Sequence, residues 1–223
     1  MFRRGMTTGV MAVALSAVCL GADGWESTGF TGWSDQTLRE LLADSPWAGP
    51  ATVSRPRTPS TDTPVIDKAV VTWTTALPMR QALVRQAVGL NGAVTKDAAA
   101  YLSLVPNTYV VALLVSGGPS SATYASQAQE VQKETFLMRT DGRSPLEAMT
   151  VEAQAVDQTG KLITGPVALS PEGGSTLFVF QFAKGLALTM IDREVEFATK
   201  VGGYTIKKKF KMKDMVFKGE LAL

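Results

Sequence analysis

The stretch REVEFATKVGGYTIKKKFKMK, residues 193–213, is the part of the sequence that decides the fold class. Two runs rich in strand-forming residues flank Gly202-Gly203, a dipeptide that favours a two-residue turn between antiparallel strands. When Val201 is placed opposite Tyr204, the pairing can be counted outward along both strands. It brings three lysines opposite carboxylates: Lys209 with Glu196, Lys211 with Glu194, and Lys213 with Asp192. The sequence therefore predicts a β-hairpin with a defined register.

The lysine run KKKFKMK, residues 207–213, admits two interpretations. Alternate residues of a strand point to one face, so four of its lysines form a stripe that suits phosphate or lipid head groups. The hairpin register instead gives most of these lysines carboxylate partners, at about 0.2–1 kcal/mol for each cross-strand pair. We therefore expect a solvated, charge-balanced sheet face. A one-residue slip of the register would restore the binding stripe.

Other segments extend the β-rich pattern and add short helices. Runs rich in β-branched and aromatic residues predict strands at 68–76, 108–117, 135–140, 147–156, 161–169 and 175–182. Capping residues and helical spacing predict helices at 34–44, 78–88, 95–104 and 120–134. Arg80 and Arg85 fall off the apolar face of the second helix, so we expect both to be exposed, with binding of an anion as the alternative. The fold class is α+β: mainly an antiparallel β-sandwich, of which an immunoglobulin-like arrangement is one form, with short helices inserted in the N-terminal half.

The N-terminus has the pattern of a signal peptide. Arg3 and Arg4 precede an apolar run at 9–20 that is shorter than the roughly 20 residues of a membrane-spanning helix. We expect residues 1–22 to be a cleaved leader and the protein to be exported, either periplasmic or extracellular. Two alternatives remain: an uncleaved anchor, and a lipoprotein attached through Cys19, although Val18 is bulky for that motif.

Charge and missing residue types exclude several classes of function. The chain has 22 basic and 20 acidic residues, and loss of Arg3 and Arg4 leaves 20 of each, so no global field attracts nucleic acid or anionic lipid. It has no histidine and a single cysteine, Cys19, which excludes histidine-dependent triads and His- or Cys-based metal sites. No nucleotide-binding or esterase motif is present, and we expect no cofactor. An enzyme would need a Ser-Lys dyad or a pair of carboxylates.

The segment after the leader, residues 23–48, is predicted to be an aromatic arm with a short helix. Ser34 suits the N-cap of that helix. The possible interaction surface of the arm consists of Trp25, Phe30, Trp33 and Trp47. These rings either pack on the domain's own sheet or dock on a partner or membrane surface. Residues 49–65 are predicted to be a Pro/Ser/Thr-rich loop or linker, in which ATVS, residues 51–54, can form a short edge strand. Residues 66–223 are predicted to be a β-rich globular domain.

Three segments carry a resemblance to a group of proteins. FTGWSDQTLRELLADSPWA resembles an N-terminal motif of uncharacterised exported bacterial proteins, in which Trp-Ser/Thr-Asp leads into a helix ending in Ser-Pro-Trp-Ala. TTALPMRQALVR and KKKFKMKDMVFKGELAL are similar to later parts of that group. The resemblance covers most of the chain after the leader. It implies an exported protein that forms one unit, and it carries no activity or catalytic residue.

These observations favour an exported, non-enzymatic domain that binds a ligand or serves envelope structure. Its partner would be another envelope protein rather than nucleic acid, with membrane contact only through an uncleaved or lipidated N-terminus. The alternatives are a histidine-free, carboxylate-dependent hydrolase, and an envelope assembly factor or lipoprotein that docks through the N-terminal arm. The ligand and the oligomeric state do not follow from the sequence.

Overall fold

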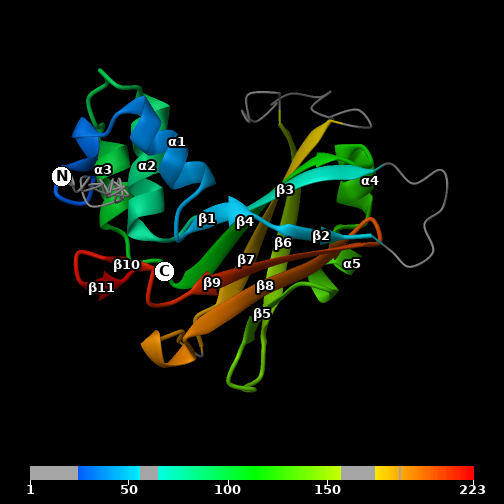
Figure 1. The fold of residues 1–223 in the computed structure, drawn as a ribbon. Helices are drawn as coiled ribbons and strands as arrows, with labels where there is room; N and C mark the ends of the chain where they lie inside the picture. Colours follow the sequence, from blue (N-terminus) through cyan, green and yellow to red (C-terminus); the bar gives the residue numbers. More distant parts are fainter. Residues whose placement is uncertain (1–24, 56–64, 157–173, 186) are drawn as a thin grey trace, which may run out of the picture.

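A computed structural model describes residues 25–55, 65–156, 174–185 and 187–223 (Figure 1). The expected signal peptide and the expected strand at 161–169 lie outside the described residues. A large antiparallel sheet forms most of the described structure, with a group of helices at each end. No helix in this part of the chain combines the length and apolar character needed to cross a membrane.

The described sheet has nine strands in the order β1-β3-β4-β7-β6-β5-β8-β9-β2, and every neighbouring pair is antiparallel. The strands of this sheet are β1 (Ala48–Pro50), β2 (Thr52–Ser54), β3 (Ile66–Trp73), β4 (Thr108–Gly117), β5 (Phe136–Arg139), β6 (Leu146–Val156), β7 (Ser175–Ala183), β8 (Glu194–Val201) and β9 (Tyr204–Lys211). A separate hairpin contains β10 (Val216–Phe217) and β11 (Glu220–Leu221). The α+β, mainly antiparallel fold is confirmed.

The chain closes the sheet on itself at β1 and β2. Only Ala51 separates these two strands, yet β1 pairs with β3 and β2 pairs with β9 at opposite ends of the strand order. The edge strand expected at 51–54 is present as β2, whereas the loop predicted to begin at residue 49 is wrong for Gly49 and Pro50, which pair with β3 in spite of their loop-like composition. An immunoglobulin-like arrangement keeps two separate sheets, so that form of the expectation does not describe the strand order.

The folded-over sheet encloses one main core between its two layers. Trp73 of β3 meets Phe210 of β9 with ring centroids 5.3 Å apart, and Phe180 of β7 meets Phe197 of β8 at 5.4 Å. All four side chains are at most 1% exposed. Aromatic contacts of this kind join the layers and add to the stabilisation from apolar burial.

The β8–β9 hairpin has the predicted register. Val201 pairs with Tyr204, and the pairing continues outward through Glu196 with Lys209 to Glu194 with Lys211. The turn residues Gly202 and Gly203 have φ angles of 55° and 81°. Positive φ at both central positions is what a tight hairpin turn requires, and glycine adopts it without steric cost.

The helices form two groups (Figure 1). At one end, beside the β10–β11 hairpin, lie α1 (Asp35–Ala43), α2 (Leu77–Val88) and α3 (Lys96–Ser103); at the other lie α4 (Ser121–Ser126) and α5 (Ala128–Lys133). Ser34 Oγ accepts a hydrogen bond from Thr37 N, as predicted for the cap of α1. The expected helix at 120–134 is divided at Gln127. Two 3₁₀ turns, η2 (Phe30–Gly32) and η3 (Met190–Asp192), complete the helical elements.

Arg80 and Arg85 correct another expectation, because each is only 6% exposed. The Nη1 atom of Arg80 donates to the carbonyls of Tyr101 and Leu104 at 2.9 Å each, so this side chain holds the end of α3. Arg85 donates to the carbonyl of Gly89 at 3.1 Å, just after α2. Backbone carbonyls accept hydrogen bonds from the Nη atoms of both buried guanidinium groups, and a helical periodicity pattern does not reveal such acceptors.

Candidate functional site

The aromatic arm lies on the domain itself. Trp33 and Trp47 are 2% and 1% exposed, while Trp25 and Phe30 are half-buried. Trp33 Nε1 donates to the carbonyl of Trp25 at 3.0 Å, which folds the arm back on itself. Trp47 Nε1 donates to the carbonyl of Ala222 at 2.8 Å and so ties the turn after α1 to the C-terminal segment. The four rings therefore do not form one exposed surface.

Trp25 is the point where three segments meet. Its ring meets Trp33 edge-on at 5.4 Å and Trp47 edge-on at 6.2 Å. It also stacks on Phe217 of β10, with centroids 5.5 Å apart and an interplanar angle of 4°. The arm, the turn after α1 and the β10–β11 hairpin are thereby held together by one half-exposed indole. Each such aromatic pair contributes about 0.5–1.5 kcal/mol beyond its buried area.

A cavity of about 320 Å³ lies at this meeting point. We call it the Trp25 pocket; its lining residues are Trp25, Glu26, Thr37, Glu40, Leu41, Asp44, Ser45, Pro46, Trp47 and Asp214. The lining contains four carboxylates and neither lysine nor arginine. Two indoles and a leucine supply apolar surface beside them. Sequence analysis missed this site because its acidic residues come from the arm, from α1 and from the turn after β9.

Two of these carboxylates occupy positions that helix stability disfavours. Glu40 is in the last turns of α1 and Asp44 is its C-cap residue. The C-terminal end of a helix carries the partial negative charge of the backbone dipoles, so lysine or arginine stabilises it and a carboxylate does not. Glu40 receives a hydrogen bond from Gln36 Nε2 at 2.9 Å, but no basic residue lies in the last turn. The acidic wall of the pocket is therefore not explained by the stability of α1.

The chemistry of the Trp25 pocket suits a positively charged organic group. Carboxylates attract the charge, and an indole face attracts a cation through its quadrupole. A metal ion needs several ligands converging on one point. Among the described residues, no group of three or more His, Cys, Asp or Glu side chains is placed to hold one.

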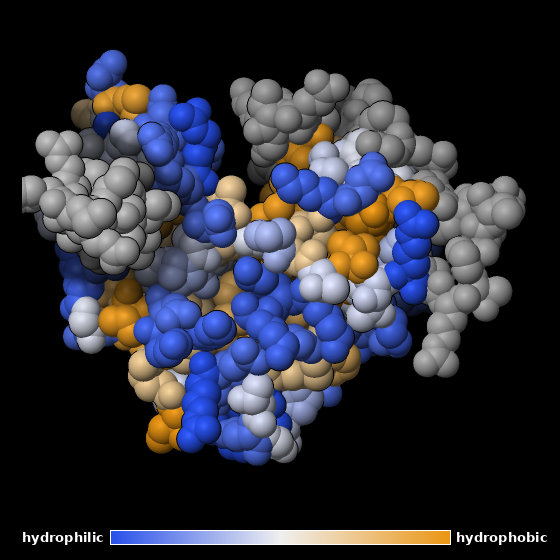
Figure 2. Space-filling model, in the orientation of Figure 1, coloured by the Kyte–Doolittle hydropathy of each residue, from blue (hydrophilic) through white to orange (hydrophobic). Residues whose placement is uncertain are grey.

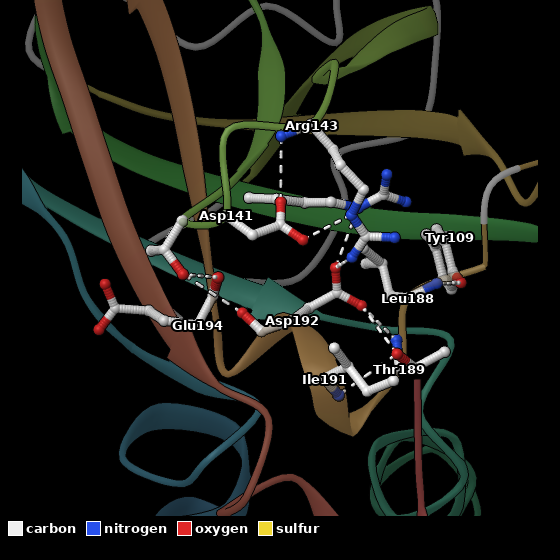
Figure 3. A network of polar contacts seen from close by, with 10 residues as sticks. Tyr109, Asp141, Arg143, Leu188, Thr189, Ile191, Asp192 and Glu194 are labelled. Carbon is white, nitrogen blue, oxygen red and sulfur yellow. Dashed lines mark hydrogen bonds and ion pairs between the residues drawn. The ribbon is translucent and has the colours of Figure 1, made fainter.

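A second polar cluster surrounds Asp192, at the end of η3 (Figure 3). Its buried carboxylate pairs with Arg139 Nε at 3.2 Å and also accepts a hydrogen bond from Arg143. The other carboxylate oxygen accepts from Thr189 N at 2.6 Å, which completes a capping box for η3. Arg143 also binds Asp141, and this bonding holds the pKa of the Asp141 carboxyl below its usual value. The cluster joins the β5–β6 turn to η3, and the Asp192 side chain is fully buried.

The Asp192 cluster corrects the predicted charge balance of the lysine run. Lys213 does not pair with Asp192, because residues 190–192 form a 3₁₀ turn and strand alternation begins only at Glu194. Glu194 accepts from Lys209 at 2.8 Å, diagonally across the hairpin. Glu196 likewise accepts from Lys207 at 2.8 Å. Within the described residues Lys211 and Lys213 have no ion pair. The lysines of this strand are therefore neutralised by carboxylates only in the half of the hairpin nearer the Gly202-Gly203 turn.

Comparison with known proteins supplies no template for either cluster. The chain matches no family model, no curated protein and no solved structure. The assignment of a function therefore depends on the geometry and chemistry of the residues described above.

Proposed function

We propose that this chain is an exported, non-enzymatic binding domain whose Trp25 pocket takes a positively charged organic group. The group we favour is an arginine or lysine side chain of a partner polypeptide in the cell envelope. One observation carries the proposal: four carboxylates and no basic residue line a cavity that also contains Trp25 and Trp47. Because Trp33 and Trp47 are buried, the pocket supports this binding role better than a free aromatic arm does.

The size and chemistry of the pocket fit one side chain. A volume of about 320 Å³ is at the lower end of the range for small-ligand sites, roughly 300–1,000 Å³. A cation over an indole contributes about 0.5–1 kcal/mol at an exposed site and about 2 kcal/mol when desolvated. The methylene groups of arginine or lysine add apolar contact along the pocket wall. A single side chain therefore binds weakly, and a partner that presents it on a larger surface binds more tightly.

The proposal is tested with a matched pair of ligands. N-acetyl-arginine amide and its uncharged isostere N-acetyl-citrulline amide are titrated into the full chain, and binding is followed by isothermal calorimetry and tryptophan emission. We expect the arginine derivative to bind at least about tenfold more tightly, because two favourable contacts of roughly 0.7 kcal/mol each give that factor. Equal affinity for the two ligands would refute the role of charge.

Paired variants locate the binding site. E40Q/D44N removes two carboxylates from the pocket and should weaken binding of the arginine derivative about tenfold. The control E147Q/E152Q makes the same change of charge on β6, whose two glutamates are exposed and do not line the pocket. If both double variants weaken binding equally, the ligand responds to overall charge and the pocket is not its site.

A further inference from the structure

An exposed apolar turn projects from the end of the β8–β9 hairpin opposite its Gly-Gly turn. Met190 and Ile191 of η3 are 48% and 81% exposed, and they are adjacent in the chain. Figure 1 shows η3 at the lower margin of the molecule, and Figure 2 shows an apolar area beside hydrophilic side chains at that margin. Water is an unfavourable environment for two neighbouring large apolar side chains, so this turn is suited to a contact.

Three cations lie beside Met190 of the apolar turn. Arg193, Lys211 and Lys213 line a cavity of about 330 Å³ together with Met190 and Glu194. The carboxylate of Glu194 already accepts from Lys209, and the described part of the chain provides no ion pair for the three cations. Strand alternation would place Arg193 on the inner face with Val195, but Arg193 is exposed and its φ angle is 53°. The backbone therefore turns this cation outward despite the steric cost of positive φ.

The Asp192 cluster holds the turn in place. Asp192 accepts hydrogen bonds from the backbone and the side chain of Thr189 and pairs with Arg139 and Arg143 (Figure 3). Ile191 N in turn donates to Thr189 Oγ1 at 3.3 Å. Ile191 is therefore exposed on a turn whose backbone is held by hydrogen bonds and ion pairs. Contact of this turn with another surface requires little additional ordering of the chain.

We propose that the η3 tip, formed by Met190, Ile191, Arg193, Lys211 and Lys213, docks on the surface of an anionic lipid bilayer. The apolar pair enters the boundary between head groups and acyl chains, and the three cations lie at the level of the lipid phosphates. Free phosphate satisfies the cations but leaves Ile191 in water, whereas a bilayer satisfies both. This contact is independent of the Trp25 pocket and of any contact made by the N-terminus.

A fluorescent label at the tip tests the contact directly. The full chain carrying Cys19→Ser and Ile191→Cys has a single thiol, which is labelled with an environment-sensitive dye. We expect its emission to shift to the blue with vesicles of phosphatidylglycerol and phosphatidylcholine, but not with pure phosphatidylcholine. The reference variant carries Cys19→Ser and Ala125→Cys, with the label on exposed α4 at the other end of the molecule. No shift at position 191, or equal shifts at both positions, would overturn the proposal.

Charge variants on one strand give a matched comparison. K211Q/K213Q removes two unpaired lysines, and K207Q/K209Q removes two lysines that are ion-paired with Glu196 and Glu194. At about 1 kcal/mol for each lysine near an anionic surface, K211Q/K213Q should weaken vesicle binding about thirtyfold, measured by titration of the label at position 191. K207Q/K209Q should weaken it severalfold less. Equal losses would show attraction by overall charge and would overturn a docking site at the tip.

The apolar contact distinguishes a bilayer from soluble anions. Ile191→Ser, with the dye moved to the neighbouring Met190→Cys in the Cys19→Ser background, should lower affinity for the anionic vesicles about tenfold through the loss of buried apolar surface. Inorganic phosphate added at matched ionic strength should not displace the protein. If phosphate competes, or if Ile191→Ser binds normally, the tip is an anion site and not a bilayer contact.

Discussion

Replacement of two buried tyrosines by phenylalanine should change the free energy of unfolding in opposite directions. Tyr109 is 2% exposed, and its hydroxyl accepts a hydrogen bond from Leu188 N at 2.8 Å. Tyr124 is fully buried, and its hydroxyl has no hydrogen-bond partner in the described structure. That hydroxyl lies against Gly118, where a Cβ atom would come within 2.1 Å of it. Replacing each tyrosine by phenylalanine therefore removes one oxygen from two different environments.

The expected magnitudes follow from hydrogen-bond satisfaction. Tyr109→Phe leaves the Leu188 N–H buried without an acceptor and should destabilise the protein by about 1–3 kcal/mol. Tyr124→Phe removes a desolvated hydroxyl that gains nothing in the native state. It should stabilise the protein by about 1 kcal/mol, because the dispersion attraction of the oxygen for its neighbours offsets only part of the gain. For a chain of this length, 1 kcal/mol corresponds to roughly 2–4 °C in Tm.

The pH dependence of the free energy of unfolding gives a second test of the buried tyrosine hydroxyls. Burial raises the pKa of both hydroxyls above the usual value for tyrosine, most strongly for Tyr124. Above about pH 10 the unfolded chain loses these protons while the native state keeps them, so the unfolded state binds fewer protons. Stability is therefore full below pH 10 and falls as pH rises beyond it, by up to about 1.4 kcal/mol per pH unit for each group. Tyr124→Phe should reduce this slope.

The assay is urea unfolding of the full chain, followed by circular dichroism at pH 7 and at pH 11. The free energies of unfolding of the wild type and the two phenylalanine variants are compared at each pH. The reasoning about hydroxyl satisfaction is wrong if the two variants change stability in the same direction at pH 7. It is also wrong if Tyr124→Phe leaves the alkaline loss of stability unchanged.

Two other predictions concern buried charges. Asp192→Asn removes the carboxylate that faces the buried Arg139 and should cost about 3–5 kcal/mol in urea unfolding, whereas Asp141→Asn on the exposed side of the same cluster should have a much smaller effect. Arg80→Met removes both hydrogen bonds to the carbonyls at the end of α3; it should lower stability by about 2 kcal/mol and speed amide hydrogen exchange in that helix relative to α1.

The sequence predicts those helices and strands whose capping and turn residues lie within a few positions of them. The caps of α1 and α3 are Ser34 and Thr95, each of which accepts from a backbone N–H three residues later. The β8–β9 register followed from the Gly202-Gly203 turn because pairing propagates residue by residue from a fixed turn. Composition also indicated an antiparallel, mainly β fold, because turn signals rather than long helices separate the strands.

Features set by distant contacts did not follow from these patterns. Gly49 and Pro50 have the composition of a loop, and they belong to a strand because β3 supplies their hydrogen-bond partners. The edge strand at 51–54 was expected, but its partner β9, about 150 residues away, was not. Strand alternation predicts a pair between Lys213 and Asp192, but two arginines of the β5–β6 region draw that carboxylate inward. Side-chain ion pairing depends on which groups are near in space, and strand register alone does not fix it.

The Trp25 pocket and the η3 tip both consist of residues that are distant in the sequence and meet only in the folded chain. The Trp25 pocket combines Glu26, Glu40 of α1, its C-cap residue Asp44, and Asp214. Only the packing of the arm on the C-terminal hairpin brings them around one cavity. The sequence by itself determined the charges, the aromatic residues and the local turns of the hairpin and helices. The tertiary structure decided which charges are neutralised and which face open space, because Coulomb interactions and burial depend on distances between segments that are far apart in the chain.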